Sequence, residues 1–67
     1  MNARANTTTS PVRAARERAG LTREQLAVRA GLSSSTLYLA ERAGLLSDES
    51  ATKLAKVLGV TAEELRP

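Results

Sequence analysis

Two short helical patterns in close succession constrain what this chain can fold into more than any other feature. Residues 22–41 contain both patterns, and each begins with its own cap signal. Thr22 is followed three residues later by Gln25, a capping-box spacing that satisfies free amide groups at the start of a helix. Gly31 supplies the left-handed position at which the first helix ends, and Ser33 starts the second. The pattern therefore predicts a helix, a tight turn and a second helix.

Further cap signals on both sides of this unit predict three more helices. Ser10 precedes a helix with proline at its first position, Ser47 caps a fourth helix, and Thr61 begins a short last one. The apolar residues are mostly Ala and Leu, which suit helices in close contact and supply little for a sheet. We therefore expect an all-α fold. It would be a compact five-helix domain over residues 10–67, preceded by a disordered N-terminal arm over residues 1–9, which lacks periodicity.

The chain has no cysteine and no histidine. Without them the usual zinc, haem and nucleophile–base constellations cannot be built, and the carboxylates have no catalytic spacing. We therefore expect no enzymatic activity, no metal and no cofactor. No apolar run reaches membrane-spanning length and no signal-peptide core is present, so we expect a cytoplasmic protein that does not act at a membrane.

The net charge of +3 is distributed unevenly along the chain. Residues 1–42 carry seven arginines and three glutamates, whereas residues 43–67 carry three basic and four acidic side chains. The basic half therefore contains the helix-turn-helix pattern, as a polyanion-binding surface requires. The second helix of such a unit can enter the major groove of DNA. Charge and motif together indicate duplex DNA as the partner.

Two adjoining segments resemble a known family of DNA-binding proteins. The run Q-L-A-V-R-A-G-L-S-S-S-T-L, with Glu41 following, is similar to the lambda-repressor/Cro-like group, also called XRE-type regulators. The later run S-D-E-S-A-T-K-L-A-K-V-L-G-V-T-A-E-E-L is similar to that family's fourth and fifth helices, and the resemblance covers roughly Pro11 to Leu65. It implies a lambda-repressor-like domain and a sequence-specific transcriptional regulator from a bacterium or phage, working in the bacterial cytoplasm or nucleoid. Such a Cro-like protein or stand-alone repressor would occlude a promoter through its third helix, and no small-molecule effector is expected.

In such a domain the first side chains of the third helix reach the edges of the bases. By position these are Ser34 and Ser35, with Leu39 one turn further on. Serine hydroxyls discriminate bases less sharply than Arg or Gln side chains do, and Leu39 could meet a thymine methyl group. The alternatives are plain solvent exposure for the serines, and packing on the protein itself or exposure for Leu39.

Five further side chains are candidate contacts to the DNA backbone: Arg13, Arg23, Thr36, Tyr38 and Arg42. Arg23 follows a helix cap, where amide groups and the helix dipole also attract a phosphate. Arg13 lies on an exposed side of the first helix and Arg42 at the end of the third. Tyr38 lies on the outward side of the third helix, although burial is the usual position for a tyrosine. For the arginines the alternative is a solvated face.

Arg16 and Glu41 form a separate case because both lie on the apolar faces of their helices. At the matching positions the family often has a partly buried ion pair. The resemblance therefore implies a structural ion pair that holds the first helix against the third and does not touch bases. Removing one partner would leave a buried charge unpaired.

A protein-interaction module with the same fold, antitoxin-like or anti-repressor, is the main alternative. Its support is the apolar pair Leu45 and Leu46 in a loop beside the third helix. A fainter resemblance to the mercury-resistance regulators is opposed by the helical pattern over residues 47–59, where that family has a winged hairpin. One small domain would gain specificity by pairing, so we expect a monomer or weak homodimer in free solution and pairing chiefly on DNA. The resemblance implies that Leu45, Leu46 and residues 60–67 make the contact, because the family's protomers commonly meet beyond the third helix. Alternatively, one of the two leucines caps the core.

Overall fold

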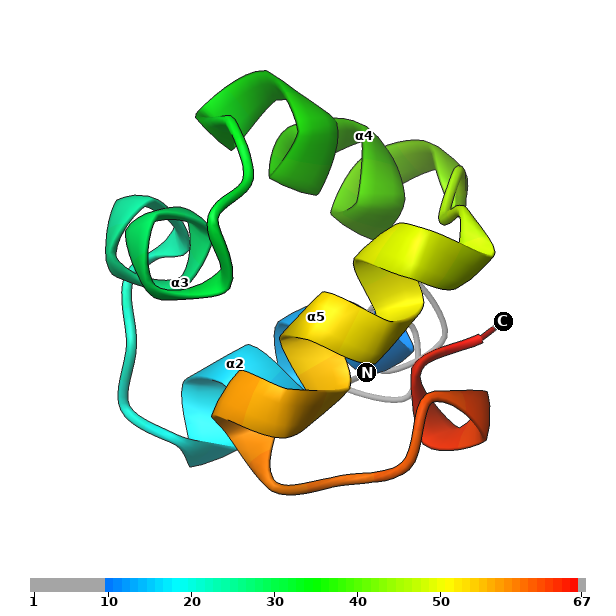
Figure 1. Ribbon diagram of the computed structural model, residues 1–67. Coiled ribbons are helices and arrows are strands. Elements are labelled where there is room, and N and C mark those ends of the chain that lie inside the picture. The colour runs from blue at the N-terminus through cyan, green and yellow to red at the C-terminus, as the bar shows by residue number, and fades with distance from the viewer. Residues whose placement is uncertain (1–9, 67) are drawn as a thin grey trace, which may run out of the picture.

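The computed structural model describes residues 10–66, which form four α-helices and one 3-10 turn (Figure 1). In chain order these are α2 (Pro11–Arg18), α3 (Arg23–Ala30), α4 (Ser34–Ala43), α5 (Asp48–Leu58) and η1 (Glu63–Leu65). No strand occurs within residues 10–66, and the all-α prediction is confirmed. The predicted arm, residues 1–9, lies outside the described residues. None of the described helices is long and apolar enough to cross a membrane.

The α-helices begin at the caps that the sequence predicts. Four cap side chains accept a hydrogen bond from the backbone amide three residues later, over 3.0–3.1 Å: Ser10, Thr22, Ser33 and Ser47. The amide of Thr22 also donates to Gln25 Oε1 at 2.9 Å, which completes the predicted capping box. Gly31 ends α3 with a φ of 72°, a left-handed conformation in which a residue with a Cβ atom would be strained. Local backbone chemistry therefore sets where α3 starts and stops.

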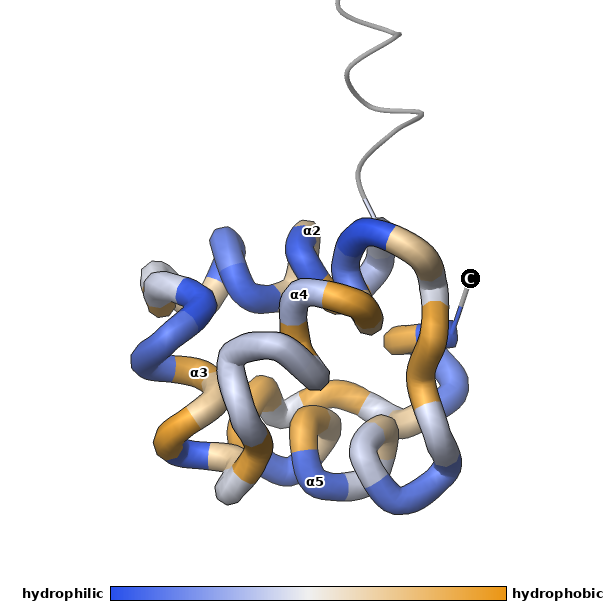
Figure 2. Tube along the Cα trace, turned by 90° about the horizontal axis from the view of Figure 1, so that it is seen from above, coloured by the Kyte–Doolittle hydropathy of each residue, from blue (hydrophilic) through white to orange (hydrophobic). Residues whose placement is uncertain are grey.

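The core lies where all five elements meet. Each element contributes one of the largest fully buried side chains: Val12, Leu26, Leu37, Leu54 and Leu65. Fully burying one such side chain contributes about 1.5–3 kcal/mol. Buried alanines between them let the helices approach closely: Ala15, Ala27, Ala30, Ala40, Ala51 and Ala55. Figure 2 shows apolar and polar stretches alternating along the chain, as expected for helices that bury one face each.

The last predicted helix is a single 3-10 turn rather than an α-helix. Ala62 is the N-cap residue of this turn and makes no side-chain cap bond, but the hydroxyl of Thr61, just before it, accepts a hydrogen bond from the amide of Glu64 at 3.2 Å. The turn is short because Pro67 follows closely, and the residue before a proline is pushed toward extended conformations. Arg66 accordingly has φ −84° and ψ 145°. The turn nevertheless places Leu65 in the core, with 1% of its surface exposed.

The two helices of the predicted helix-turn-helix, α3 and α4, pack against each other across a three-residue connection, residues 31–33. In Figure 1, α4 crosses the top of the molecule while α3 is seen along its axis. The other helices support this pair, because α2 packs on α4 and α5 packs on α3. One side of α4 is left without a covering element among residues 10–66. That uncovered side is where a ligand can approach.

Candidate DNA interface

The uncovered side of α4 carries the three predicted base contacts. The opposite, buried side consists of Leu37, Ala40 and Glu41. Ser34 and Ser35 are exposed in the first turn of α4, and Leu39 is 45% exposed one turn later. Leu39 is therefore only partly covered by its own protein and is not a core side chain. All three side chains are accessible to a ligand that approaches α4.

These side chains share a depression of about 400 Å³ with the start of α3. Its lining is Arg23, Glu24, Ser34, Ser35, Tyr38 and Leu39. Glu24 was not among the side chains predicted from the sequence to contact DNA. Its place beside Arg23 in the first turn of α3 could have indicated it. A carboxylate can accept a hydrogen bond from the amino group of cytosine, a base that hydroxyls alone select poorly. The depression therefore offers hydroxyls, an acceptor, a cation and an apolar side chain to the same ligand.

A second hollow of about 450 Å³ adjoins the first and shares Arg23 and Tyr38 with it. Its lining comes from α2, α3 and α4: Arg13, Arg23, Tyr38, Glu41 and Arg42. Three guanidinium groups and one carboxylate line the hollow, so its charge is positive. The guanidinium carbons of Arg23 and Arg42 lie 5.1 and 6.0 Å from the centre of the Tyr38 ring, within cation–π range. The structure thus brings together every predicted backbone contact except Thr36.

Arg13 and Thr36 also have partners within the chain. Arg13 Nε donates to Glu17 Oε2 at 3.0 Å on the exposed side of α2. An exposed pair of this kind contributes little, so Arg13 can turn to a phosphate at small cost. Thr36 is half-buried. Its amide donates a hydrogen bond to the hydroxyl oxygen of Ser33 at 3.0 Å, and the Ser33 hydroxyl donates one to Thr36 Oγ1 at 2.9 Å. Thr36 therefore contributes to the cap of α4, away from the arginines.

Arg16 and Glu41 lie in contact between α2 and α4. Arg16 Nε donates to Glu41 Oε2 at 2.7 Å and Arg16 Nη2 to Oε1 at 3.2 Å, a bidentate arrangement. Arg16 Nη1 donates to the carbonyl of Leu21 at 2.9 Å. Glu41 has a second partner that the sequence does not predict, because Arg23 Nε lies 3.4 Å from its Oε1. Among the described residues no buried side-chain nitrogen or oxygen lacks a partner, as burial of charge requires.

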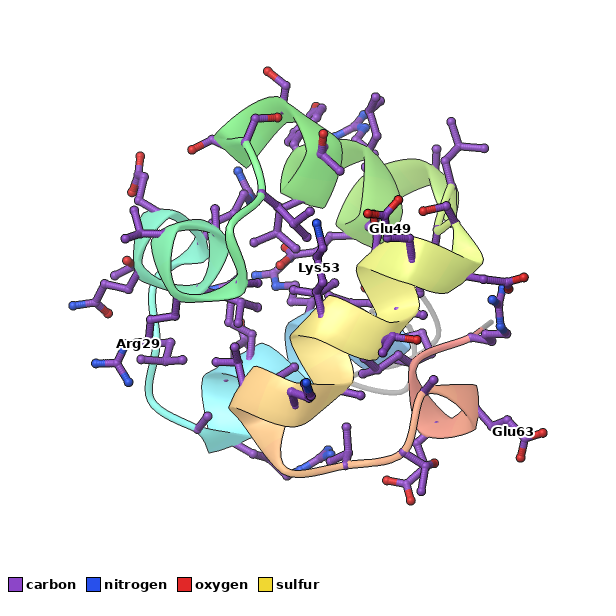
Figure 3. The ribbon with its side chains drawn as sticks, viewed as in Figure 1. Arg29, Glu49, Lys53 and Glu63 are labelled. Carbon is purple, nitrogen blue, oxygen red and sulfur yellow. The ribbon has the colours of Figure 1, made fainter. Side chains whose placement is uncertain are left out.

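Arg29 and Glu63 lie away from this surface (Figure 3). Figure 3 shows Arg29 projecting from α3 on the side away from α4, and Glu63 projecting from η1. Glu49 and Lys53 pair with each other on α5 at 3.3 Å. The second hollow therefore concentrates three arginines at the α2–α3–α4 junction, whereas Arg29 lies on another part of the surface.

The two leucines that follow α4 differ in burial. Leu45 is 62% exposed, whereas Leu46 is half-buried against the core. The alternative in which one of the leucines caps the core therefore holds for Leu46. From the C-terminal segment, Leu65 lies in the core and Val60 packs against it. Among the predicted pairing residues that the structure describes, Leu45 is the large apolar side chain that remains exposed.

An uncovered helix with polar and apolar side chains at its start, flanked by clustered arginines, defines a helix-turn-helix DNA-binding domain. Comparison with known families agrees, because a helix-turn-helix family model matches residues 12–65. The chain belongs to this family, the XRE-type, lambda-repressor/Cro-like helix-turn-helix proteins. Membership makes it a transcription regulator that binds double-stranded DNA, in a family that is typically non-enzymatic. None of the curated proteins compared with the chain matches it.

Proposed function

We propose that the protein is a sequence-specific regulator that binds duplex DNA with α4 in the major groove. The observation that carries this proposal is the adjacency of two hollows that share Arg23 and Tyr38. One hollow offers groups suited to base edges and the other offers clustered guanidiniums suited to a phosphate. A helix laid in the major groove meets bases and a flanking strand at the same time, so adjacent sites of these two kinds are required.

The two hollows divide the proposed contacts, except for Thr36, which lines neither hollow and would contact the backbone from the cap of α4. We assign base contacts to Ser34, Ser35 and Leu39, because hydroxyls can donate to or accept from base edges and an apolar side chain can meet a thymine methyl group. We assign backbone contacts to Arg13, Arg23, Thr36, Tyr38 and Arg42, and the structural ion pair to Arg16 and Glu41. Backbone contacts supply most of the affinity and fix the register, whereas base contacts supply the sequence preference.

In this proposal the protein acts as a Cro-like protein or stand-alone repressor. A domain lying in the major groove of a promoter excludes the polymerase from the same DNA, so occlusion is a sufficient mechanism. The place of action is the bacterial cytoplasm or nucleoid, and the gene belongs to a bacterium or a phage. No small-molecule effector is required.

Pairing on DNA is part of the proposal. Serine hydroxyls discriminate bases weakly, so one half-site gives limited specificity, and two protomers one helical turn apart would multiply it. The exposed Leu45 supplies a contact point. A stable interface buries about 1,200–2,000 Å², far more than one leucine and its neighbours offer. We therefore expect a monomer or weak dimer in free solution and two protomers on a pseudo-palindromic site.

In vitro selection of bound duplexes from a random pool tests the proposal. We expect an enriched half-site, with a log–log salt slope of roughly −3 to −4 for about three or four neutralised phosphates per protomer. A pool without enrichment, together with affinity that stays flat from low to moderate salt, would contradict the proposal. In that case the antitoxin-like or anti-repressor module, favoured by the exposed Leu45, becomes the better account.

A further inference from the structure

Arg23 lines both hollows, and its guanidinium is held from two sides. Its Nε lies 3.4 Å from Glu41 Oε1, and its guanidinium carbon lies 5.1 Å from the centre of the Tyr38 ring. Both contacts come from α4, whereas Arg23 belongs to α3. Tertiary packing therefore orients a long side chain that would otherwise sample many rotamers. The side chain is still 39% exposed, so a ligand can reach it.

Most of the hydrogen-bonding capacity of Arg23 is unused within the described residues. A guanidinium carries five N–H donors, and only the one on Nε has a partner among residues 10–66. Glu41 does not depend on Arg23, because Arg16 donates to both of its carboxylate oxygens, at 2.7 and 3.2 Å. The four N–H groups on Nη1 and Nη2 of Arg23 therefore remain for an external anion, in the planar fork that matches a phosphate.

Tyr38 contacts a second guanidinium, that of Arg42, one turn further along α4. The guanidinium carbon of Arg42 lies 6.0 Å from the ring centre, and Arg42 has no ion-pair partner within residues 10–66. The tyrosine is 41% exposed, so its ring is not a core side chain. An exposed ring that contacts two guanidiniums has the chemistry of a support for cations.

We propose that Tyr38 is a positioning residue whose ring holds Arg23 and Arg42 as a preformed clamp for one phosphodiester group of the DNA backbone. This inference rests on the proposed function and deepens it, because it assigns the work of Tyr38 to the ring and not to the hydroxyl. A guanidinium that is already held loses less rotamer freedom when it binds, so the phosphate is bound more tightly. Glu41 completes the clamp by fixing Nε of Arg23.

Fluorescence anisotropy with a mixed-sequence duplex of about 20 base pairs, two helical turns, tests the role of the ring. Tyr38→Phe keeps the ring and should bind within about twofold of the wild type. Tyr38→Leu and Tyr38→Gln remove it and should weaken binding about four- to a hundred-fold, since each of the two released arginines must then lose rotamer freedom on binding, which is worth about two- to tenfold. Arg29→Ala is the matched charge control, because it removes an arginine that points away from α4 (Figure 3), and it should weaken binding less than loss of the ring.

A double-mutant cycle separates positioning from direct contact. If the ring acts through the two arginines, Tyr38→Leu should weaken an Arg23→Ala, Arg42→Ala background by less than about twofold at low salt. The same loss in both backgrounds would overturn the inference. Thermal melts accompany each variant, and the ring-less variants should melt close to the wild type because Tyr38 lies on the surface. If one ring-less variant does not fold, the other carries the comparison.

The remaining outcomes separate this inference from the proposed function. If Tyr38→Phe weakens DNA binding as much as Tyr38→Leu does, the inference is overturned, because the hydroxyl would then make the contact. Tyr38→Leu binding as tightly as the wild type would also overturn it, because the ring would then hold nothing. Both results leave DNA binding by the wild type intact. A wild type without salt-dependent duplex binding would instead refute the proposed function, and this inference with it.

Discussion

Replacing Glu41 with alanine is expected to destabilise the protein strongly, because it leaves the buried guanidinium of Arg16 without its anion. The side chains of Glu41 and Arg16 are 4% and 11% exposed, and two of the three hydrogen bonds of Arg16 end on Glu41. Only the bond to the carbonyl of Leu21 would remain. Breaking a buried pair in this way costs about 3–5 kcal/mol. A chain of 67 residues has a total stability of about 3–10 kcal/mol, so the variant would be close to unfolding.

Urea denaturation followed by far-UV circular dichroism measures this loss, with thermal melts in parallel. In a domain of this size 1 kcal/mol shifts the melting temperature by about 4–8 °C, so a loss of 3 kcal/mol should lower it by about 12–24 °C. Arg23→Ala is the control, because it removes the second partner of the Glu41 carboxylate and leaves the pair with Arg16 in place. The side chain of Arg23 is 39% exposed and its contact with Glu41 is longer, so this variant should lose less than about 1 kcal/mol.

The double variant Arg16→Ala, Glu41→Ala distinguishes an ion pair from two unrelated buried side chains. With both charges gone no unpaired charge is left, so the loss should fall short of the sum of the single losses by about 0.5–3 kcal/mol. Arg16→Met with Glu41→Leu should recover most of the stability, because apolar replacements of buried pairs are often neutral or better. Single losses that add to within about 0.5 kcal/mol would refute the reasoning, since the two side chains would then not stabilise each other.

Three further outcomes are expected for the proposed interface, measured on the selected duplex. Ser34→Ala and Ser35→Ala should each change the selected bases and leave the melting temperature unchanged, because both side chains are exposed; a drop as large as that of a core truncation would show that α4 is misplaced. Replacing thymines one at a time by uracil, which lacks the methyl group, should weaken binding by the wild type at one or two positions and have no effect on Leu39→Ala. Equal losses in both proteins would argue against a methyl contact. Sedimentation should show a monomer or weak dimer in free solution and two protomers per selected site, with Leu45→Ser reducing the pairing; strictly one protomer per site at saturation would rule it out.

The sequence by itself determined the start and end of most helices. A cap such as Thr22 with Gln25 and a stop such as Gly31 act through hydrogen bonds and backbone angles only a few residues apart, so they work before any tertiary contact exists. The apolar spacing of α4 likewise determined which side of that helix is buried, and hence that Ser34 and Leu39 lie on the other. The contact between Arg16 and Glu41 is long-range, and a family resemblance was needed to expect it.

The burial of Leu65 and the different positions of the two leucines after α4 were decided by tertiary structure. A capping signal at Thr61 is compatible with an α-helix or a 3-10 turn, and Pro67 limits the length of the element locally, but only packing places Leu65 in the core. Leu45 and Leu46 are chemically identical neighbours in sequence. Only the direction in which the chain leaves α4 places Leu46 against the core and Leu45 in solvent.

The surroundings of Arg23 show the limit of local inference most clearly. Its place after a helix cap predicts an isolated arginine available to a phosphate, and nothing nearby in sequence indicates Glu41 or Tyr38, 18 and 15 residues later. Those contacts depend on the angle and distance at which α3 packs on α4, which the common core sets and no local pattern encodes. The sequence therefore determined which side chains are charged and roughly where each helix presents them. The packing of the helices decided that Glu24 joins the depression beside Ser34, Ser35 and Leu39, and that Arg13, Arg23 and Arg42 line one hollow with Tyr38.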